Sequence, residues 1–141
     1  LRYFTVYGSW YRPDMAMFIF TQKIMAGNPI PVFNNGNMKR DFTYIDDVIV
    51  GIHSAIKNNY PCEVFNLGNN KSEHLMDLIG IIEKVLEKKA KINFQPMQLG
   101  DVPESFADID KSTERLHYMP TTNIDEGIPR FVDWYKEYYK I

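Results

Sequence analysis

Short apolar segments rich in β-branched and aromatic residues alternate with longer amphipathic segments along this chain of 141 residues. The first apolar segment, Leu1–Tyr7, ends at Gly8 and predicts a buried strand that leads into a loop. A helix should follow, with Asp14 as its N-cap and its end near Ala26, because Gly27 stands where left-handed backbone commonly terminates helices. The opening of the chain therefore predicts a strand, a loop and a helix.

A hairpin is predicted directly after that helix. Pro29 and Pro31 prevent the helix from continuing, and Ile30–Phe33 has the composition of a short strand. Asn34–Asn37 contains residues that tolerate a positive φ in a tight turn. Asp41–Tyr44 would then be the strand that returns.

The remaining segments continue the alternation between helix-like and strand-like patterns. They predict a helix that begins at Asp46 and Asp47 and runs to about Lys57, a strand over Glu63–Leu67, a long helix capped by Ser72, a strand over Lys91–Gln95, a loop from Pro96 to Pro103, a short helix after Asp110, and a last helix from about Asp125 to Tyr139. Pro129 is expected either to kink the last helix or to move its start towards Ile128. This order of elements predicts an α/β fold with a small mixed sheet.

Composition narrows the class of protein. The length suits one domain, and 45% hydrophobic and 24% charged residues are ordinary for a soluble globular protein without a membrane span. A net charge of −2 offers no basic surface for nucleic acid, so neither nucleic acid nor membrane is an expected partner. Cys62 is the only cysteine, which excludes an internal disulfide and a cysteine-based zinc site. We expect no metal site and a cytoplasmic location.

Two arginines are the strongest candidates for binding chemistry. Arg40, beside the predicted hairpin, can grip a diphosphate through two parallel charge-assisted hydrogen bonds, or it can pair with Asp41 or Asp46. Arg12 is a second cation, with an ordinary loop arginine as the alternative. By contrast, Asp46 and Asp47 suit helix capping better than metal binding.

Three motifs carry a resemblance to a known family. They are the segment Leu1–Gly8, the Arg-Pro-Asp-Met sequence at Arg12, and the Arg-Asp-Phe-Thr-Tyr-Ile-Asp-Asp sequence at Arg40–Asp47. Together they resemble the extended short-chain dehydrogenases/reductases, most closely the NAD-dependent UDP-glucuronate 4-epimerases, over nearly the whole chain. The resemblance implies that residues 1–141 form the C-terminal substrate-binding lobe of an extended Rossmann-type enzyme, a nucleotide-sugar-binding region.

The cofactor half of such an enzyme is expected to lie before Leu1. No glycine fingerprint between a strand and a helix occurs in the chain, and no Tyr-x-x-x-Lys occurs, since Tyr44 is followed at that spacing by Val48 and Tyr135 by Tyr139. We therefore expect no catalytic residue among these 141 residues and an inactive chain. NAD would be bound mainly by the other half.

The resemblance also implies roles for residues of the predicted site. Arg40 corresponds to a diphosphate ligand, and Arg12 would reach the diphosphate or a sugar carboxylate. Asp101, in a Gly-Asp-Val-Pro segment, would accept hydrogen bonds from ribose hydroxyls or steer an arginine. Gln98 stands where many relatives have arginine, and it cannot neutralise phosphate.

Three residues of the strands have both a functional and a structural interpretation. The resemblance implies that Thr5 contacts the sugar or its carboxylate, that Phe4 packs near the nicotinamide, and that Phe33 lines the uracil pocket. Without the resemblance, Thr5 is a good strand residue and both phenylalanines are core residues. The aromatic stripe at Phe131–Tyr139 is expected to dock on the core.

The favoured hypothesis is the substrate-binding part of an enzyme that converts UDP-glucuronate to UDP-galacturonate, with a UDP-sugar as its partner and a product destined for surface polysaccharide. Another nucleotide-sugar decarboxylase or dehydratase, and a non-enzymatic sugar-nucleotide binding module, remain as alternatives. The apolar first strand would leave an unpaired edge and favour self-association.

Overall fold

The computed structural model describes all residues from 1 to 141. It contains five α-helices, which are α1 (Ala16–Met25), α2 (Ile45–Asn58), α3 (Leu75–Leu86), α4 (Asp110–Leu116) and α5 (Ile124–Tyr139). A 3₁₀ turn, η1, covers Phe33–Gly36. The strands are β1 (Arg2–Tyr3), β2 (Thr5–Tyr7), β3 (Pro29–Val32), β4 (Lys39–Arg40), β5 (Phe42–Tyr44), β6 (Asn66–Leu67), β7 (Glu73–His74) and β8 (Lys91–Phe94). None of the five helices combines the length and the apolar composition needed to cross a bilayer.

The strands form four pairs. Three are parallel, namely β1 with β6, β2 with β5, and β3 with β8, whereas β4 pairs antiparallel with β7. The predicted first strand is split at Phe4, where the backbone changes partner from Leu67 to Asp41. This combination of parallel and antiparallel pairs with helices is the mixed α/β fold that the sequence predicts.

The predicted hairpin is wrong. Strand β3 pairs with β8 instead, with Ile30 opposite Ile92 and Val32 opposite Phe94. The two prolines of β3, Pro29 and Pro31, remove every second backbone donor and so leave only one edge of the strand able to donate. That edge is taken by β8.

The helices lie close to their predicted positions but begin differently. None of the N-cap residues makes a side-chain capping bond, and α1 and α3 begin at Ala16 and Leu75, two and three residues beyond the predicted caps Asp14 and Ser72. Helix α5 begins at Ile124, so the alternative of a start near Ile128 is wrong and Pro129 lies inside the helix. The predicted strand over Glu63–Leu67 is reduced to β6.

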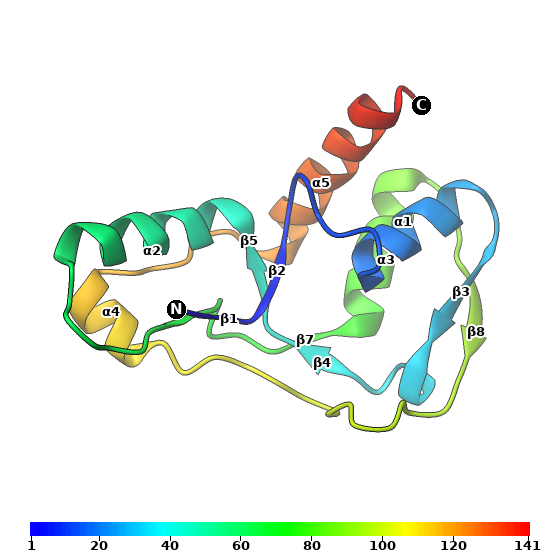
Figure 1. Ribbon diagram of the computed structural model, residues 1–141. Helices are drawn as coiled ribbons and strands as arrows, with labels where there is room; N and C mark the ends of the chain where they lie inside the picture. The colour runs from blue at the N-terminus through cyan, green and yellow to red at the C-terminus, as the bar shows by residue number, and fades with distance from the viewer.

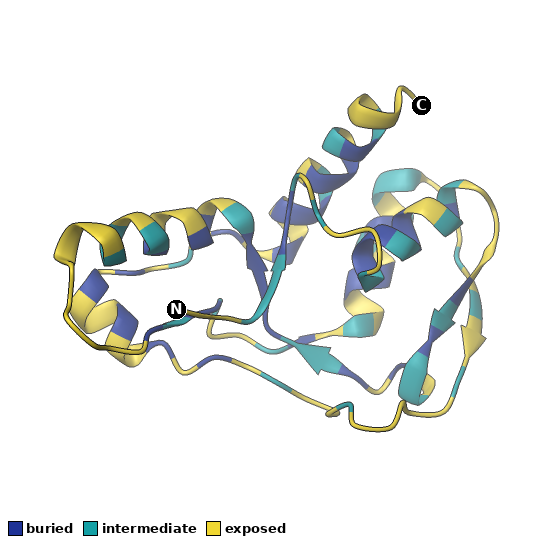
Figure 2. Cartoon of the chain, in the orientation of Figure 1, coloured by how far each residue is buried: buried dark blue, intermediate teal, exposed yellow.

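Two separate hydrophobic cores lie on either side of β2 and β5 (Figure 1; Figure 2). The larger core gathers α1, α3, α5 and the neighbouring strands, and α5 contributes the buried Phe131, Val132 and Tyr135. The predicted docking of the aromatic stripe is therefore confirmed for Phe131 and Tyr135, whereas Tyr138 and Tyr139 at the end of the helix remain exposed. The smaller core has seven buried residues, supplied by α2, α4, β6 and the segments beside them.

Candidate functional site

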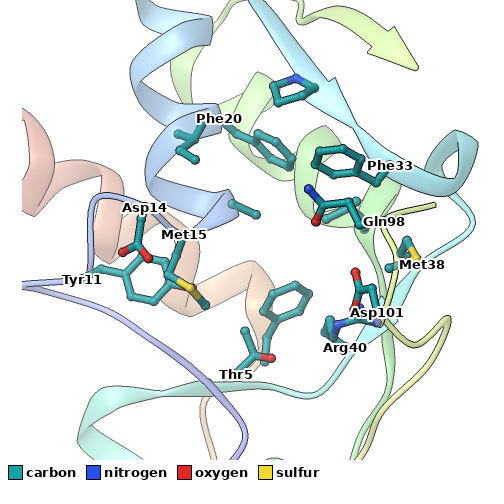
Figure 3. Close-up of a pocket in the computed structure, with 15 residues that line it drawn as sticks. Thr5, Tyr11, Asp14, Met15, Phe20, Phe33, Met38, Arg40, Gln98 and Asp101 are labelled. Carbon is teal, nitrogen blue, oxygen red and sulfur yellow. The ribbon is translucent and has the colours of Figure 1, made fainter. Parts of the chain in front are cut away.

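A cavity of about 540 Å³ opens between α1, β3, η1 and the segment that carries β4 and β5 (Figure 3). Four of the predicted site residues line it, although they come from distant parts of the chain: Thr5, Phe33, Arg40 and Asp101. Its remaining walls are mostly hydrophobic and include Phe20, Pro31, Met38, Phe42 and Leu75. A mostly apolar cleft with a few polar groups is the usual form of a small-molecule site.

Arg40 and Asp101 form an ion pair at one end of this cavity (Figure 3). Nη2 of Arg40 donates to Oδ1 of Asp101 at 2.6 Å, and Nη1 donates to the carbonyl oxygen of Lys39 at 2.7 Å. The Arg40 side chain is 19% exposed and that of Asp101 is 33% exposed. The partner is therefore neither Asp41 nor Asp46, the two carboxylates nearest in sequence, and Asp101 does steer an arginine.

Asp41 fixes the backbone next to Arg40, a role that the sequence did not reveal. Its carboxylate is fully buried and accepts hydrogen bonds from the Thr43 hydroxyl at 2.9 Å, the Asn69 amide at 2.6 Å and the Ala107 amide at 3.0 Å. One side chain thereby ties β5 to two loops far away in sequence. The only local signal was Thr43, two residues later.

The charges of the cavity are unevenly distributed. Arg40 is the only cationic residue among those that line it, whereas Asp14 and Asp101 are both carboxylates. Gln98 lies near Phe33, where it can donate a hydrogen bond without adding charge (Figure 3). An anionic ligand in this cavity would therefore depend on Arg40.

The two other predicted site residues, Arg12 and Phe4, line a second cavity of about 280 Å³. Tyr11 and Met15 line both cavities, so the two spaces are neighbours. Arg12 donates to both carboxylate oxygens of Asp14, from Nε at 3.1 Å and from Nη2 at 2.6 Å. This hydrogen bonding lowers the pKa of the exposed Asp14 carboxyl below its ordinary value. Arg12 is thus one cavity away from Arg40.

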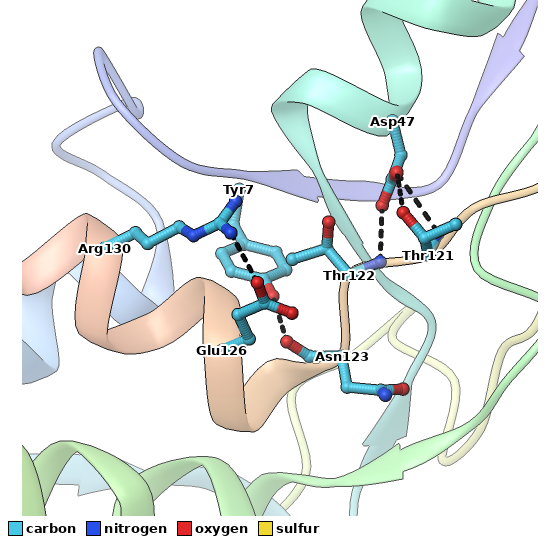
Figure 4. A network of polar contacts seen from close by, with 7 residues as sticks. All are labelled: Tyr7, Asp47, Thr121, Thr122, Asn123, Glu126 and Arg130. Atoms are coloured by element: carbon cyan, nitrogen blue, oxygen red, sulfur yellow. Dashed lines mark hydrogen bonds and ion pairs between the residues drawn. The ribbon is translucent and has the colours of Figure 1, made fainter.

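A polar network joins the start of α2 to the segment just before α5 (Figure 4). Oδ1 of Asp47 accepts from the backbone and hydroxyl of Thr121, both at 3.2 Å, and Oδ2 accepts from the Thr122 amide at 3.0 Å. The expected capping bonds from Asp46 and Asp47 are therefore not made, since the N-cap residue is Tyr44 and Asp47 holds a distant loop. Both carboxylates do lie in the first turn of α2, where negative charge favours the positive end of the helix.

Tyr7 lies at the centre of the same network (Figure 4). Its hydroxyl donates to the carbonyl oxygen of Asn123 at 3.4 Å, and burial raises the pKa of the phenol above its ordinary value. At Gly127 an added Cβ would collide with the Tyr7 hydroxyl, so the close approach of α5 to β2 requires glycine. Arg130 pairs with Glu126 one turn apart on α5.

Nothing in the structure groups the histidines with other ligands. His53, His74 and His117 are all exposed, and no group of three or more histidine, cysteine, aspartate or glutamate residues lies close enough to hold a metal ion. The candidate site is therefore the pair of neighbouring cavities.

Comparison with known proteins relates this arrangement to a family. Residues 1–68, which include Thr5, Phe33 and Arg40, match the NAD dependent epimerase/dehydratase family. An uncharacterised protein of Methanocaldococcus jannaschii is 54% identical over 137 residues, which make up 97% of this chain and 42% of that protein. These 68 of the chain's 141 residues are thus similar to the NAD dependent epimerase/dehydratase family. The chain spans less than half the length of the relatives that it matches here.

Two further relatives are named for an activity. UDP-glucuronate 4-epimerase 4 of Arabidopsis thaliana is 44% identical over 156 residues, covering 99% of this chain and 36% of the plant protein. The crystal structure of UDP-glucuronic acid 4-epimerase from Bacillus cereus, in complex with UDP-glucuronic acid and NAD, superposes with a TM-score of 0.92 at 36% identity. That match covers 98% of this chain and 45% of the other, and it confirms the predicted C-terminal lobe of a Rossmann-type epimerase.

Proposed function

We propose that this chain is the substrate-binding part of an NAD-dependent UDP-glucuronate 4-epimerase. The observation that carries the proposal is the position of Arg40, at the end of a mostly apolar cleft that also contains Thr5, Phe33 and Asp101. A guanidinium suits the diphosphate of a nucleotide sugar because it can donate two parallel hydrogen bonds to phosphate oxygens. The named relatives add the sugar, glucuronate.

Each remaining part of the ligand has a matching surface in the cavity. Phe33 and Pro31 offer apolar contacts for a uracil ring, and Asp101 offers carboxylate oxygens to ribose hydroxyls. Thr5, on β2, would donate its hydroxyl to the sugar or to the sugar carboxylate. In this arrangement UDP is held firmly, while the sugar lies towards the second cavity.

The second cavity fits one end of the cofactor. Phe4 and the close-packed Gly8 line it and offer an apolar surface suited to a nicotinamide ring, whereas no glycine-rich cradle for the pyrophosphate occurs in these residues. NAD, when bound, would accept and return hydride at C4 of the sugar. This chain would orient the sugar for that exchange.

Calorimetry with UDP tests the nucleotide pocket. Arg40→Ala removes two charge-assisted hydrogen bonds, so the dissociation constant for UDP should rise about 10- to 100-fold. Arg40→Lys should lose part of that affinity, because an ammonium keeps the positive charge but cannot donate two parallel hydrogen bonds as a guanidinium does. Lys57→Ala, an exposed cation on α2 that lines neither cavity, is the matched control and should leave affinity unchanged.

Product analysis tests the reaction itself. The complete gene product, supplied with UDP-glucuronate and NAD, should form UDP-galacturonate. Release of carbon dioxide or loss of water from the sugar would instead indicate a decarboxylase or a dehydratase. UDP binding without any turnover would favour a binding module.

A further inference from the structure

Trp10 is an exposed aromatic residue with a left-handed backbone conformation. It adopts φ +62°, in the left-handed region, and its side chain is 74% exposed. A non-glycine residue in that region is strained, so contacts made by its side chain help to hold it there.

Those contacts come from the last helix. The Trp10 ring lies 5.7 Å from the ring of Trp134 and 5.1 Å from the ring of Tyr138, and the two α5 rings stack on each other at 5.4 Å. Trp134 also lies 5.9 Å from the fully buried Phe131, which anchors the set to the larger core. We call Trp10, Trp134 and Tyr138 the aromatic clasp. Figure 1 shows the loop between β2 and α1 running beside α5.

The loop that the clasp holds carries residues of both cavities. Tyr11 and Met15 line both spaces, Asp14 lines the larger one, and Ser9, Trp10 and Arg12 line the smaller one. Tyr138, by contrast, lines neither, so a change at Tyr138 reaches the cavities only through the loop. Within Ser9–Met15 the only backbone amide that donates to another backbone group is that of Met15, to the Arg12 carbonyl at 3.2 Å. Side-chain contacts therefore set the course of this loop.

We infer that Trp10 is a positioning residue for the sugar end of the site. The clasp fixes the backbone of Ser9–Met15, and this in turn holds Tyr11 at the junction of the two cavities and Arg12 beside the smaller one, where the sugar of a UDP-sugar would lie. The inference rests on the proposed function. It assigns to the half-buried Trp134 and the exposed Tyr138 of α5, which line neither cavity, a share in the recognition of the sugar but not of UDP.

Backbone order of the loop is the first test. Order parameters from ¹⁵N relaxation should be near 0.85 for the amides of Ser9–Met15 in the unchanged protein and should fall below about 0.6 in Trp10→Ala and Tyr138→Ala. Tyr139→Ala is the matched control, because this neighbour is similarly exposed and has no ring contact with Trp10. Tyr138→Phe, which keeps the stacked ring, should restore order. Unchanged order in Trp10→Ala would overturn the inference.

Ligand discrimination is the second test. Calorimetry on the same variants should show UDP affinity unchanged, while the affinity gained by adding the glucuronate falls about three- to tenfold in Trp10→Ala and Tyr138→Ala. Equal loss for UDP and UDP-glucuronate, or no loss for either, would refute the positioning role. If the unchanged protein binds no UDP, the proposed function fails, and the role in sugar recognition fails with it. The relaxation experiment is independent of UDP binding, so a loss of loop order in Trp10→Ala would still show that the aromatic clasp holds Ser9–Met15.

Discussion

Replacing Asp41 with alanine should strongly destabilise the protein, since three donors converge on this one buried carboxylate. The Thr43 hydroxyl can rotate towards another acceptor, but the backbone amides of Asn69 and Ala107 cannot leave their loops. Each buried amide left without an acceptor costs about 1–3 kcal/mol, so the two together should lower the free energy of unfolding by about 2–6 kcal/mol. Domains of this size have about 5–15 kcal/mol of stability in all.

Asp41→Asn separates hydrogen bonding from charge. One oxygen remains as an acceptor, while the new amide group must face one of the two backbone donors at hydrogen-bond distance. We therefore expect the free energy of unfolding of Asp41→Asn to lie between that of the wild type and that of Asp41→Ala. This ordering would not follow if the side chain only filled space.

Urea unfolding followed by circular dichroism measures the effect. With a slope of about 2 kcal/mol per molar urea, the midpoint for Asp41→Ala should fall by about 1–3 M at unchanged slope. Asp46→Ala is the control, because Asp46 is exposed, and its free energy of unfolding should change by no more than about 0.5 kcal/mol. If both variants lost the same small amount of stability, the reasoning about Asp41 would be refuted.

Three other predictions concern different parts of the fold. Gly127→Ala should lower the thermal midpoint, because its Cβ would collide with the Tyr7 hydroxyl, and Gly127→Ala combined with Tyr7→Phe should recover part of the loss; no recovery would contradict this. The hydrogen bond from Lys111 lowers the pKa of Glu63 below its ordinary 4.5, so the pair stabilises the protein above that pH and the contribution disappears as the pH falls below it. Glu63→Gln should flatten this part of the stability profile, and an unaltered profile would count against it. Size-exclusion chromatography should show concentration-dependent association through the exposed edge of β1, which Tyr3→Lys should suppress; a monomer at every concentration would disprove it.

How far the sequence predicted this structure depended on the range of the interactions. Helices α2, α3 and α5 have apolar stripes with helical spacing. Such a helix can be predicted from local sequence because its apolar face needs a hydrophobic core to pack against, but not one particular partner. The hairpin failed because the partner of β3 is about sixty residues away, and nothing local distinguishes that partner from β5. Pairing is decided by the whole chain.

The site shows the same division. Proximity of Thr5, Phe33, Arg40 and Asp101 could be expected from family resemblance, whereas no spacing rule connects Arg40 with a carboxylate 61 positions later. The sequence predicts Asp41 as a possible partner of Arg40 and Asp47 as a helix cap, and it misses their actual donors because these lie 28 to 75 positions later. Long-range acceptors of this kind leave almost no trace in a single sequence.

The division of the interior into two cores has a consequence for how this chain would fluctuate. The larger cavity is lined by members of the seventeen-residue core and their neighbours, while the seven-residue core beneath α2 and α4 contributes nothing to its walls. Regions with fewer buried contacts open more readily and at lower free energy. Nucleotide held by Arg40 would therefore slow amide exchange in α1 and α3, and the α2–α4 side would keep opening at its own rate.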